Sequence, residues 1–331
     1  MLVDDFTRLL ERRSGLLLDL AANLQDPQVA ASLNSLEAIA RQVAPVLRLH
    51  PDDRYRPAPI EFFLSRVELG SVDRSATDFE PRIVTQVRVG GVSIAALLSQ
   101  NRFSQKSRSD VLGVKRRSDW RLYIERAQKP STITPASWKE FCEATRQGLL
   151  DGAPCYVHLR RPVDDSAAID IQYWLFYPFN GLMGTPPFSA EHEGDWEHVT
   201  VRVADDGQPL KVYYSAHDGE GSWYRLGQGS PVTLVGGSHP VVYSAYHSHA
   251  SYPTAGLIVR HGSPIDLPDD RTANGGPEVD ISQRLRLIAL GDAVVREQEW
   301  VHFSGTWGRA SSPYGPAFQA SWNVEPDVRR T

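Results

Sequence analysis

The sequence predicts a mainly β protein with α additions: an antiparallel β-sandwich that carries N-terminal helices and one inserted short helix. Two observations predict this fold. The later half of the chain contains short runs rich in Val, Ile, Tyr and Trp, each closed by Gly, Pro, Asn or Asp, among them CYVHLR, IDIQYWLFYPF, DWEHVTVRV, LKVYYSAH and PVVYSAYHSH. No long helical pattern separates these runs, which favours antiparallel pairing over βαβ units.

The chain divides into two predicted regions. Residues 1–45 are expected to be helical, because apolar side chains recur there at helical spacing. A β-sandwich domain is expected over residues 46–331, with a helical insertion near 134–152. The N-terminal helices should dock on the sandwich or pair across a homodimer. Their polar faces mix both charge signs, which argues against a membrane-surface anchor.

Composition excludes several classes of function. The net charge is -5 and no basic stripe is present, so no nucleic-acid partner is expected. The first residues lack the pattern of a signal peptide, and no apolar stretch approaches the roughly 18 residues of a transmembrane helix. We therefore expect a soluble, cytoplasmic protein whose two cysteines, Cys142 and Cys155, are free buried thiols.

The stretch EHEGDWEHVTVRV places acidic side chains directly before a strand pattern. Alternate side chains of a strand share a face, so Asp195 and Glu197 should begin an otherwise apolar face together. Two carboxylates at the rim of a core repel each other, and a positive group is expected between them: an Arg, a Lys or a metal ion. His192 precedes them in the adjoining loop, and Glu191 and Glu193 add further oxygens.

A neighbouring strand, YWLFYPFNG, ends with an amide that hard cations accept as a ligand. The predicted metal ligands are Asn180, His192, Asp195 and Glu197. Oxygen-rich sites suit Mg, Ca and Mn, whereas an imidazole shifts the preference toward Mn, Fe or Zn. We expect a divalent ion, Mg or Ca first, with Mn or Zn as alternatives. The competing interpretation is a salt-bridged or solvated strand end.

Histidines gather at other predicted strand ends. His217 ends VYYSAH and is followed by Asp218, while His247 and His249 alternate in the stretch HPVVYSAYHSHASYP. One of these imidazoles, with Asp218 as a further candidate, could act as general acid or base beside the metal. Singly, each histidine is more typical of a hydrogen-bonded core or rim position than of a ligand or a base.

Other chemistries have weaker signals. The chain has no nucleophile-elbow pattern, no P-loop and no paired-glycine dinucleotide fingerprint. The tryptophans at the C-terminal end, Trp300, Trp307 and Trp322, are expected to pack the core and not to line a ligand groove.

Several motifs in order resemble the vacuolar protein sorting-associated protein 62 family. They are APVLRLHPDDRYRPAPIEFFL, YWLFYPFNG, HEGDWEHVTVRV, SAHDGEGSW, HPVVYSAYHSHASYP, DRTANGG and FSGTWG with the later YGP. The resemblance covers roughly residues 41 to 325 and is most specific from Gln172 to Pro253.

A more distant resemblance is to the necrosis- and ethylene-inducing-peptide-like cytolysins. It implies a β-sandwich in which Mg or Ca is held by an Asp, a His and a following Asp and Glu. His192, Asp195 and Glu197 occupy matching positions, whereas Asn180 stands in place of the first aspartate and should weaken ion binding. Gly194 stands where the cytolysin motif has a second histidine. The cytolysins are secreted, whereas no export signal is recognised here.

Three functions are compatible with these residues. The first is a metal-dependent enzyme, a hydrolase or lyase, that polarises an oxygen-bearing small molecule such as a phosphate, diphosphate or sugar. The second is a non-catalytic module that uses the ion to hold a lipid head group or glycan, related to membrane sorting or to the cytolysins. The third is a structural ion.

Overall fold

The computed structural model describes residues 1–15, 17–72, 83–86, 91–101, 120–124, 134–182, 191–217, 219–260, 268–308 and 312–326. The helices are α1 (Leu2–Glu11), α2 (Leu20–Asn23), α3 (Pro27–Gln42), α4 (Ile60–Leu64), α5 (Ile94–Asn101) and α6 (Pro135–Gln147), with the 3-10 helices η2 (Ile281–Arg284), η3 (Arg296–His302), η4 (Pro316–Phe318) and η5 (Ala320–Trp322).

The strands are short except for two in the middle of the chain. They are β1 (Leu17–Leu18), β2 (Val46–Arg48), β3 (Glu68–Val72), β4 (Ile83–Gln86), β5 (Trp120–Tyr123), β6 (Cys155–Arg160), β7 (Ala168–Asn180), β8 (His192–Ala204), β9 (Pro209–Tyr214), β10 (Ser222–Arg225), β11 (Leu234–Val235), β12 (His239–Ser244), β13 (Ser251–Tyr252), β14 (Gly256–Ile258), β15 (Asp270–Thr272), β16 (Glu278–Asp280), β17 (Leu285–Leu290) and β18 (Ala293–Val295). The two long strands, β7 and β8, have 13 residues each and pair along their length.

The fold is a mixed α/β arrangement built around one large sheet. Eight strands follow the order β1-β18-β17-β6-β7-β8-β9-β10, and a smaller sheet follows the order β11-β12-β2-β16, with β13 paired to β12. Both sheets are mixed: β17 runs parallel to β6, β1 to β18, and β2 to β12. The prediction of a purely antiparallel sandwich is therefore wrong. Each parallel pair joins segments far apart in the sequence, so no turn between them could reveal it.

The large sheet has a core on each face. On one face its residues pack against the small sheet and against α1 and α3, as Tyr173, Val201, Val242 and Leu36 belong to one buried cluster. On the other face a layer of aromatic side chains contains Trp196, Trp300 and Trp307. The predicted packing role of Trp300, Trp307 and Trp322 is confirmed, because all three are buried.

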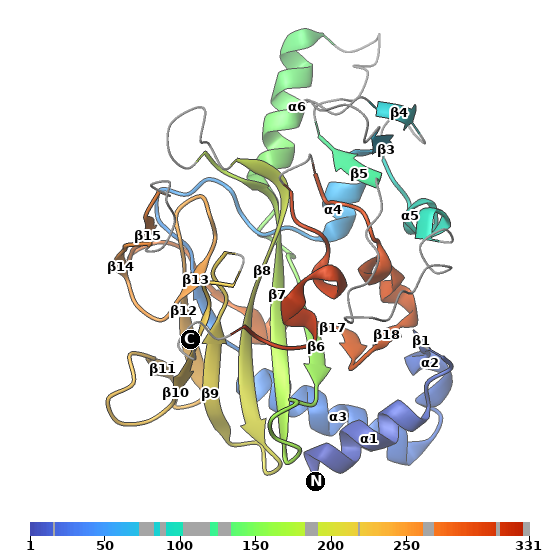
Figure 1. The fold of residues 1–331 in the computed structure, drawn as a ribbon, viewed down its shortest axis with the longest axis vertical. Helices are drawn as coiled ribbons and strands as arrows, with labels where there is room; N and C mark the ends of the chain where they lie inside the picture. The colour runs from blue at the N-terminus through green and yellow to red at the C-terminus, as the bar shows by residue number, and fades with distance from the viewer. Residues whose placement is uncertain are drawn as a thin grey trace.

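The N-terminal helices lie at one end of the long strands (Figure 1). Their apolar residues Leu2, Phe6 and Leu9 are buried in the same cluster as β7 and β8, so these helices dock on the sheet of their own chain. The Met1 ammonium pairs with Asp205, just beyond the end of β8. None of the described helices is long and apolar enough to span a membrane.

The predicted insertion helix is α6. Thr134 caps its first turn by accepting a hydrogen bond from the backbone of Ser137, and Gly148 ends it with a φ of 75°. Cys142 on this helix and Cys155 on β6 are free and buried, as predicted.

The C-terminal segment crosses the outer face of β6, β7 and β8, and Figure 1 shows it in red in front of these strands. Trp322 stacks on His158 with ring centroids 3.7 Å apart. The Glu325 carboxylate enters a buried polar group on the sheet, where it accepts hydrogen bonds from Gln172 at 2.7 Å and from Thr200, and pairs with His198 at 3.0 Å. This contact fastens the end of the chain across the sheet.

Candidate functional site

The predicted metal ligands lie at the end of β7 and β8 that is opposite the N-terminal helices. In the register of this pair, Asn180 faces His192 and Tyr177 faces Asp195. Asp195 and Glu197 project to the side of the sheet opposite Trp196, toward the segments that follow β9 and β12. The antiparallel register therefore gathers all four predicted residues at one strand end.

Gly194 gives this strand end a special local geometry. Its φ is 57°, and a Cβ there would lie 2.0 Å from the carbonyl oxygen of Trp307. No larger side chain fits, which gives a physical reason for glycine at this position. Glu193 is directed to the tryptophan layer, where its Oε1 accepts a hydrogen bond from the backbone of Ile124 at 3.3 Å.

His249 is the partner of Asp195. The turn between β12 and β13 carries this histidine, whose Nδ1 lies 2.9 Å from Asp195 Oδ2. Its ring stacks on Tyr177 with centroids 3.9 Å apart and an interplanar angle of 7°. The side chain of His249 is only 1 % exposed. Burial and stacking therefore fix the ring, and the Asp195 carboxylate has an imidazole where the sequence predicted an Arg, a Lys or a metal.

A second carboxylate, Asp53, lies on the other side of this ring. Its Oδ2 is 3.5 Å from His249 Nε2, which is buried and makes no hydrogen bond with a described residue. Asp53 also accepts the backbone N–H groups of His247 and Tyr55. Gly181, directly after β7, donates to the carbonyl of His247, and a Cβ there would lie 2.5 Å from the His247 ring. These contacts lock the turn against the end of β7.

Asp270 forms a third acidic point beside the same turn. It opens β15, is fully buried, and accepts hydrogen bonds from Ser248 at 2.6 Å, from Tyr252, and from His217 Nε2 at 2.6 Å. Burial by itself raises the pKa of Asp270, but the hydrogen bonds from His217, Ser248 and Tyr252 outweigh it, and the net shift is downward. The carboxylate is therefore ionised at neutral pH.

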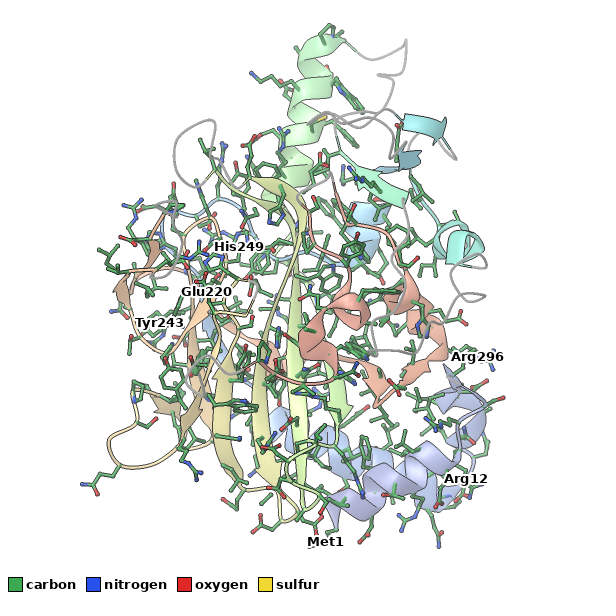
Figure 2. All side chains as sticks on the ribbon, viewed as in Figure 1. Met1, Arg12, Glu220, Tyr243, His249 and Arg296 are labelled. Carbon is green, nitrogen blue, oxygen red and sulfur yellow. The ribbon has the colours of Figure 1, made fainter. Side chains whose placement is uncertain are left out.

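The three candidate histidines share an unusual backbone conformation. Among the described residues, the non-glycine residues with positive φ are His217 at 43°, His247 at 66° and His249 at 56°. Residues other than glycine are uncommon in this region, although asparagine, aspartate and histidine are enriched there, and such residues cluster at functional sites. Figure 2 shows His249 and Glu220 on the same side of the molecule, away from Met1 and Arg12.

Negative charge dominates the electrostatics of the site. Four carboxylates, from Asp53, Asp195, Glu197 and Asp270, lie around the turn that contains His249. Burial raises the pKa of Tyr177, and the charges of Asp195, Glu197 and Asp53 raise it further. An excess of negative charge in a partly buried site favours a cation.

The donors are of the right kind for a divalent ion, but they do not converge on one point. Among the residues that the structure describes, no three His, Cys, Asp or Glu side chains are grouped closely enough to hold a metal. Asp195 Oδ2 faces His249, and Glu197 Oε2 accepts a hydrogen bond from Ser215 at 2.8 Å. Asp195 Oδ1 makes no hydrogen bond to a described residue.

The structure thus brings together seven of the residues that the sequence singled out: Asn180, His192, Asp195, Glu197, His217, His247 and His249. The eighth, Asp218, lies outside the described residues. Sequence reasoning missed Asp53 and Asp270 as parts of the site. Asp53 stands in the stretch HPDDRY and Asp270 in LPDDRT, and paired aspartates near strands were the available signal.

These features define a class: a protein of large mixed β-sheets with a histidine and carboxylate site at one sheet end. The family model for vacuolar protein sorting-associated protein 62 matches residues 135–314, more than half of the chain and most of the site. The chain belongs to this family, as its motifs predicted. Asp53 lies outside the matched range.

Two curated proteins of Saccharomyces cerevisiae are similar over part of their length. The chain is 30% identical over 171 residues to the putative vacuolar protein sorting-associated protein TDA6, which covers 44% of this chain and 36% of that protein. It is 29% identical over 163 residues to vacuolar protein sorting-associated protein 62, which covers 42% of this chain and 34% of that protein. The matched region therefore spans about a third of each relative.

Solved structures of toxins are similar at low scores. A structure described as a toxin fold for microbial attack and plant defense has 13% identity and a TM-score of 0.33, with 79% of this chain and 76% of that chain covered. Necrosis and Ethylene inducing Protein 2, from the causal agent of cocoa's witches' broom disease, has 12% identity and a TM-score of 0.33 over 81% and 82%. NLPPya in complex with mannosamine has 12% identity and a TM-score of 0.31 over 79% and 75%. Scores this low assign no shared function.

Proposed function

We propose that this chain binds an oxygen-bearing small molecule or head group through a divalent cation at the end of β8. The observation that carries the proposal is the set of four carboxylates around the turn between β12 and β13, of which Asp195 and Asp270 each contact an imidazole. Asp195 and Glu197 would hold the cation, with His192 and Asn180 at the same strand end. The bound cation would supply positive charge to ligand oxygens, and oxygen donors favour Mg or Ca over Zn.

Direct titration of the full chain tests this function. Calorimetry with calcium chloride, and separately with magnesium chloride, should show one saturable site per chain after treatment with a chelator. Glucosamine, which offers hydroxyl and ammonium groups, is the probe ligand. Its affinity should be lower in buffer that contains the chelator than in buffer that contains the preferred cation. Absence of any saturable cation binding, in protein whose folding is verified by circular dichroism, would contradict the proposal.

A metal-dependent hydrolase or lyase is the second candidate, and the strained backbone of His247 favours it. His247 Nδ1 lies 2.8 Å from the carbonyl oxygen of Leu182 and must donate to it, so Nε2 carries the lone pair. That nitrogen is not among the buried unpaired atoms, so it is open to a reacting proton. His249, by contrast, is buried and has carboxylates beside both ring nitrogens, so neither nitrogen faces a substrate.

If the chain is an enzyme that uses His247, a variant without this imidazole should lose turnover. His247→Asn keeps a residue that tolerates positive φ but removes the imidazole. In a screen of chromogenic phosphate esters and glycosides with calcium or magnesium present, wild type should release product and His247→Asn should be slower by about 100-fold or more. Equal rates for the two proteins, or no product from wild type, would leave binding as the function.

A further inference from the structure

The dyad of His217 and Asp270 has a defined hydrogen-bonding direction. An ionised carboxylate only accepts hydrogen bonds, so His217 Nε2, which is 2.6 Å from Asp270 Oδ2, must carry the proton. In the neutral ring the other nitrogen, Nδ1, then presents a lone pair. Nδ1 makes no hydrogen bond with a described residue and is not among the buried unpaired atoms, and the side chain is 20 % exposed.

The surroundings of Asp270 keep this direction fixed. The hydroxyls of Ser248 and Tyr252 both donate to the same carboxylate, and these hydrogen bonds favour its ionised form. Burial raises the pKa of Tyr252, as do the charge of Asp270 and the hydrogen bond to it, so the tyrosine stays a donor. Each partner of Asp270 is a donor, and the only outward-facing group of the dyad is an acceptor.

The dyad lies beside the proposed cation site. Ser248, which donates to Asp270, is the neighbour in sequence of His249, which pairs with Asp195. Ser215, which donates to Glu197, lies two residues before His217. Arg260, whose charge interacts with that of Asp270, is paired with Glu220 through two hydrogen bonds of 2.6 and 2.9 Å.

We propose that His217, positioned by Asp270, selects ligands that offer a hydroxyl or ammonium donor to Nδ1. This inference rests on the proposed binding function and names the residue that sets its ligand class. An anion without donors, such as sulfate, would bring only acceptors to this corner and would gain nothing from His217. The dyad acts as a positioning and specificity device and takes no part in cation binding.

Nitrogen NMR on histidine-labelled full chain tests the tautomer directly. We expect His217 Nε2 to be protonated and Nδ1 to be unprotonated at neutral pH, and the Nδ1 resonance to move when glucosamine is added. Asp270→Asn replaces an acceptor-only group by an amide and should shift the proton toward Nδ1, as in a triad whose aspartate is replaced by asparagine. A protonated Nδ1 in wild type would overturn the inference.

Binding of two probes tests the selectivity. His217→Gly suits the backbone, since glycine accepts a φ of 43°, and it removes the acceptor. We expect this variant to bind glucosamine about 10-fold more weakly, the effect of one hydrogen bond, with calcium affinity unchanged and sulfate affinity unchanged. His239→Asn, a histidine at the start of β12, is the control and should match wild type.

The outcomes separate the two proposals. Unchanged glucosamine affinity in His217→Gly, or an equal loss for glucosamine and sulfate, would overturn the role of His217 while leaving cation binding in place. Wild type that binds neither calcium nor magnesium would overturn the proposed function, and the tautomer measured by NMR would still decide the hydrogen-bonding direction of the dyad.

Discussion

Replacing Glu325 by alanine should lower the free energy of unfolding by about 3–5 kcal/mol, the range for removing one partner of a buried ion pair. The carboxylate is buried against β7 and β8, where Gln172, Thr200 and His198 all direct polar groups at it. Arg160 lies 3.5 Å away. Without the carboxylate, these groups stay buried and lose their acceptor, and the C-terminal segment loses these contacts with the sheet.

Chemical denaturation of wild type and variant measures this effect. Glu325→Gln keeps an acceptor oxygen and should lose less, whereas Glu297→Ala removes an exposed carboxylate and should change stability by no more than about 0.5 kcal/mol. Burial by itself raises the pKa of Glu325, but His198, Arg160 and Thr200 outweigh it and lower the pKa. The stabilisation is therefore present above the unfolded pKa of a glutamate and disappears as the pH falls through the lowered folded pKa. If Glu325→Ala lowers the free energy of unfolding by less than about 1 kcal/mol, the contacts of Glu325 do not hold the C-terminal segment to the sheet.

Asp195→Asn should abolish measurable cation binding and, with it, cation-dependent binding of the probe ligand. The change keeps the size of the side chain but removes the charge nearest to the proposed ion. One unit charge at 4 Å contributes about 4 kcal/mol at an effective dielectric constant of 20, so even a strongly screened loss weakens the affinity by about 100-fold or more.

Two companion variants make the Asp195 result interpretable. Asp195→Asn also changes the partner of buried His249. The melting temperature of this variant must therefore be measured alongside calorimetry. Glu197→Gln removes the second carboxylate, which contacts the Ser215 hydroxyl. It should weaken cation binding and have a smaller effect on stability. Glu297→Gln gives the same change of charge on an exposed residue. If all four proteins bind calcium equally, Asp195 and Glu197 hold no ion.

The placement of side chains predicted from the sequence was correct where it depended on neighbours along the chain. Alternation in DWEHVTVRV placed Asp195 and Glu197 on one face because a strand has a period of two. It failed for Glu193, because the positive φ of Gly194 and the contact with Trp307 interrupt that period. His249 was not identified as a partner of Asp195, since the prediction considered only an Arg, a Lys or a metal ion.

The sequence by itself determined the strand-rich composition, the helical N-terminal region, the buried tryptophans and the histidines at strand ends, because propensity, periodicity and turn residues act over a few positions. Only the tertiary structure decided the parallel pairing of β6 with β17 and the meeting of Asp53, Asp195, His249 and Asp270. These residues are separated by tens to hundreds of positions in the sequence. Their contact depends on sheet order and register, which the hydrophobic pattern of a single strand does not encode.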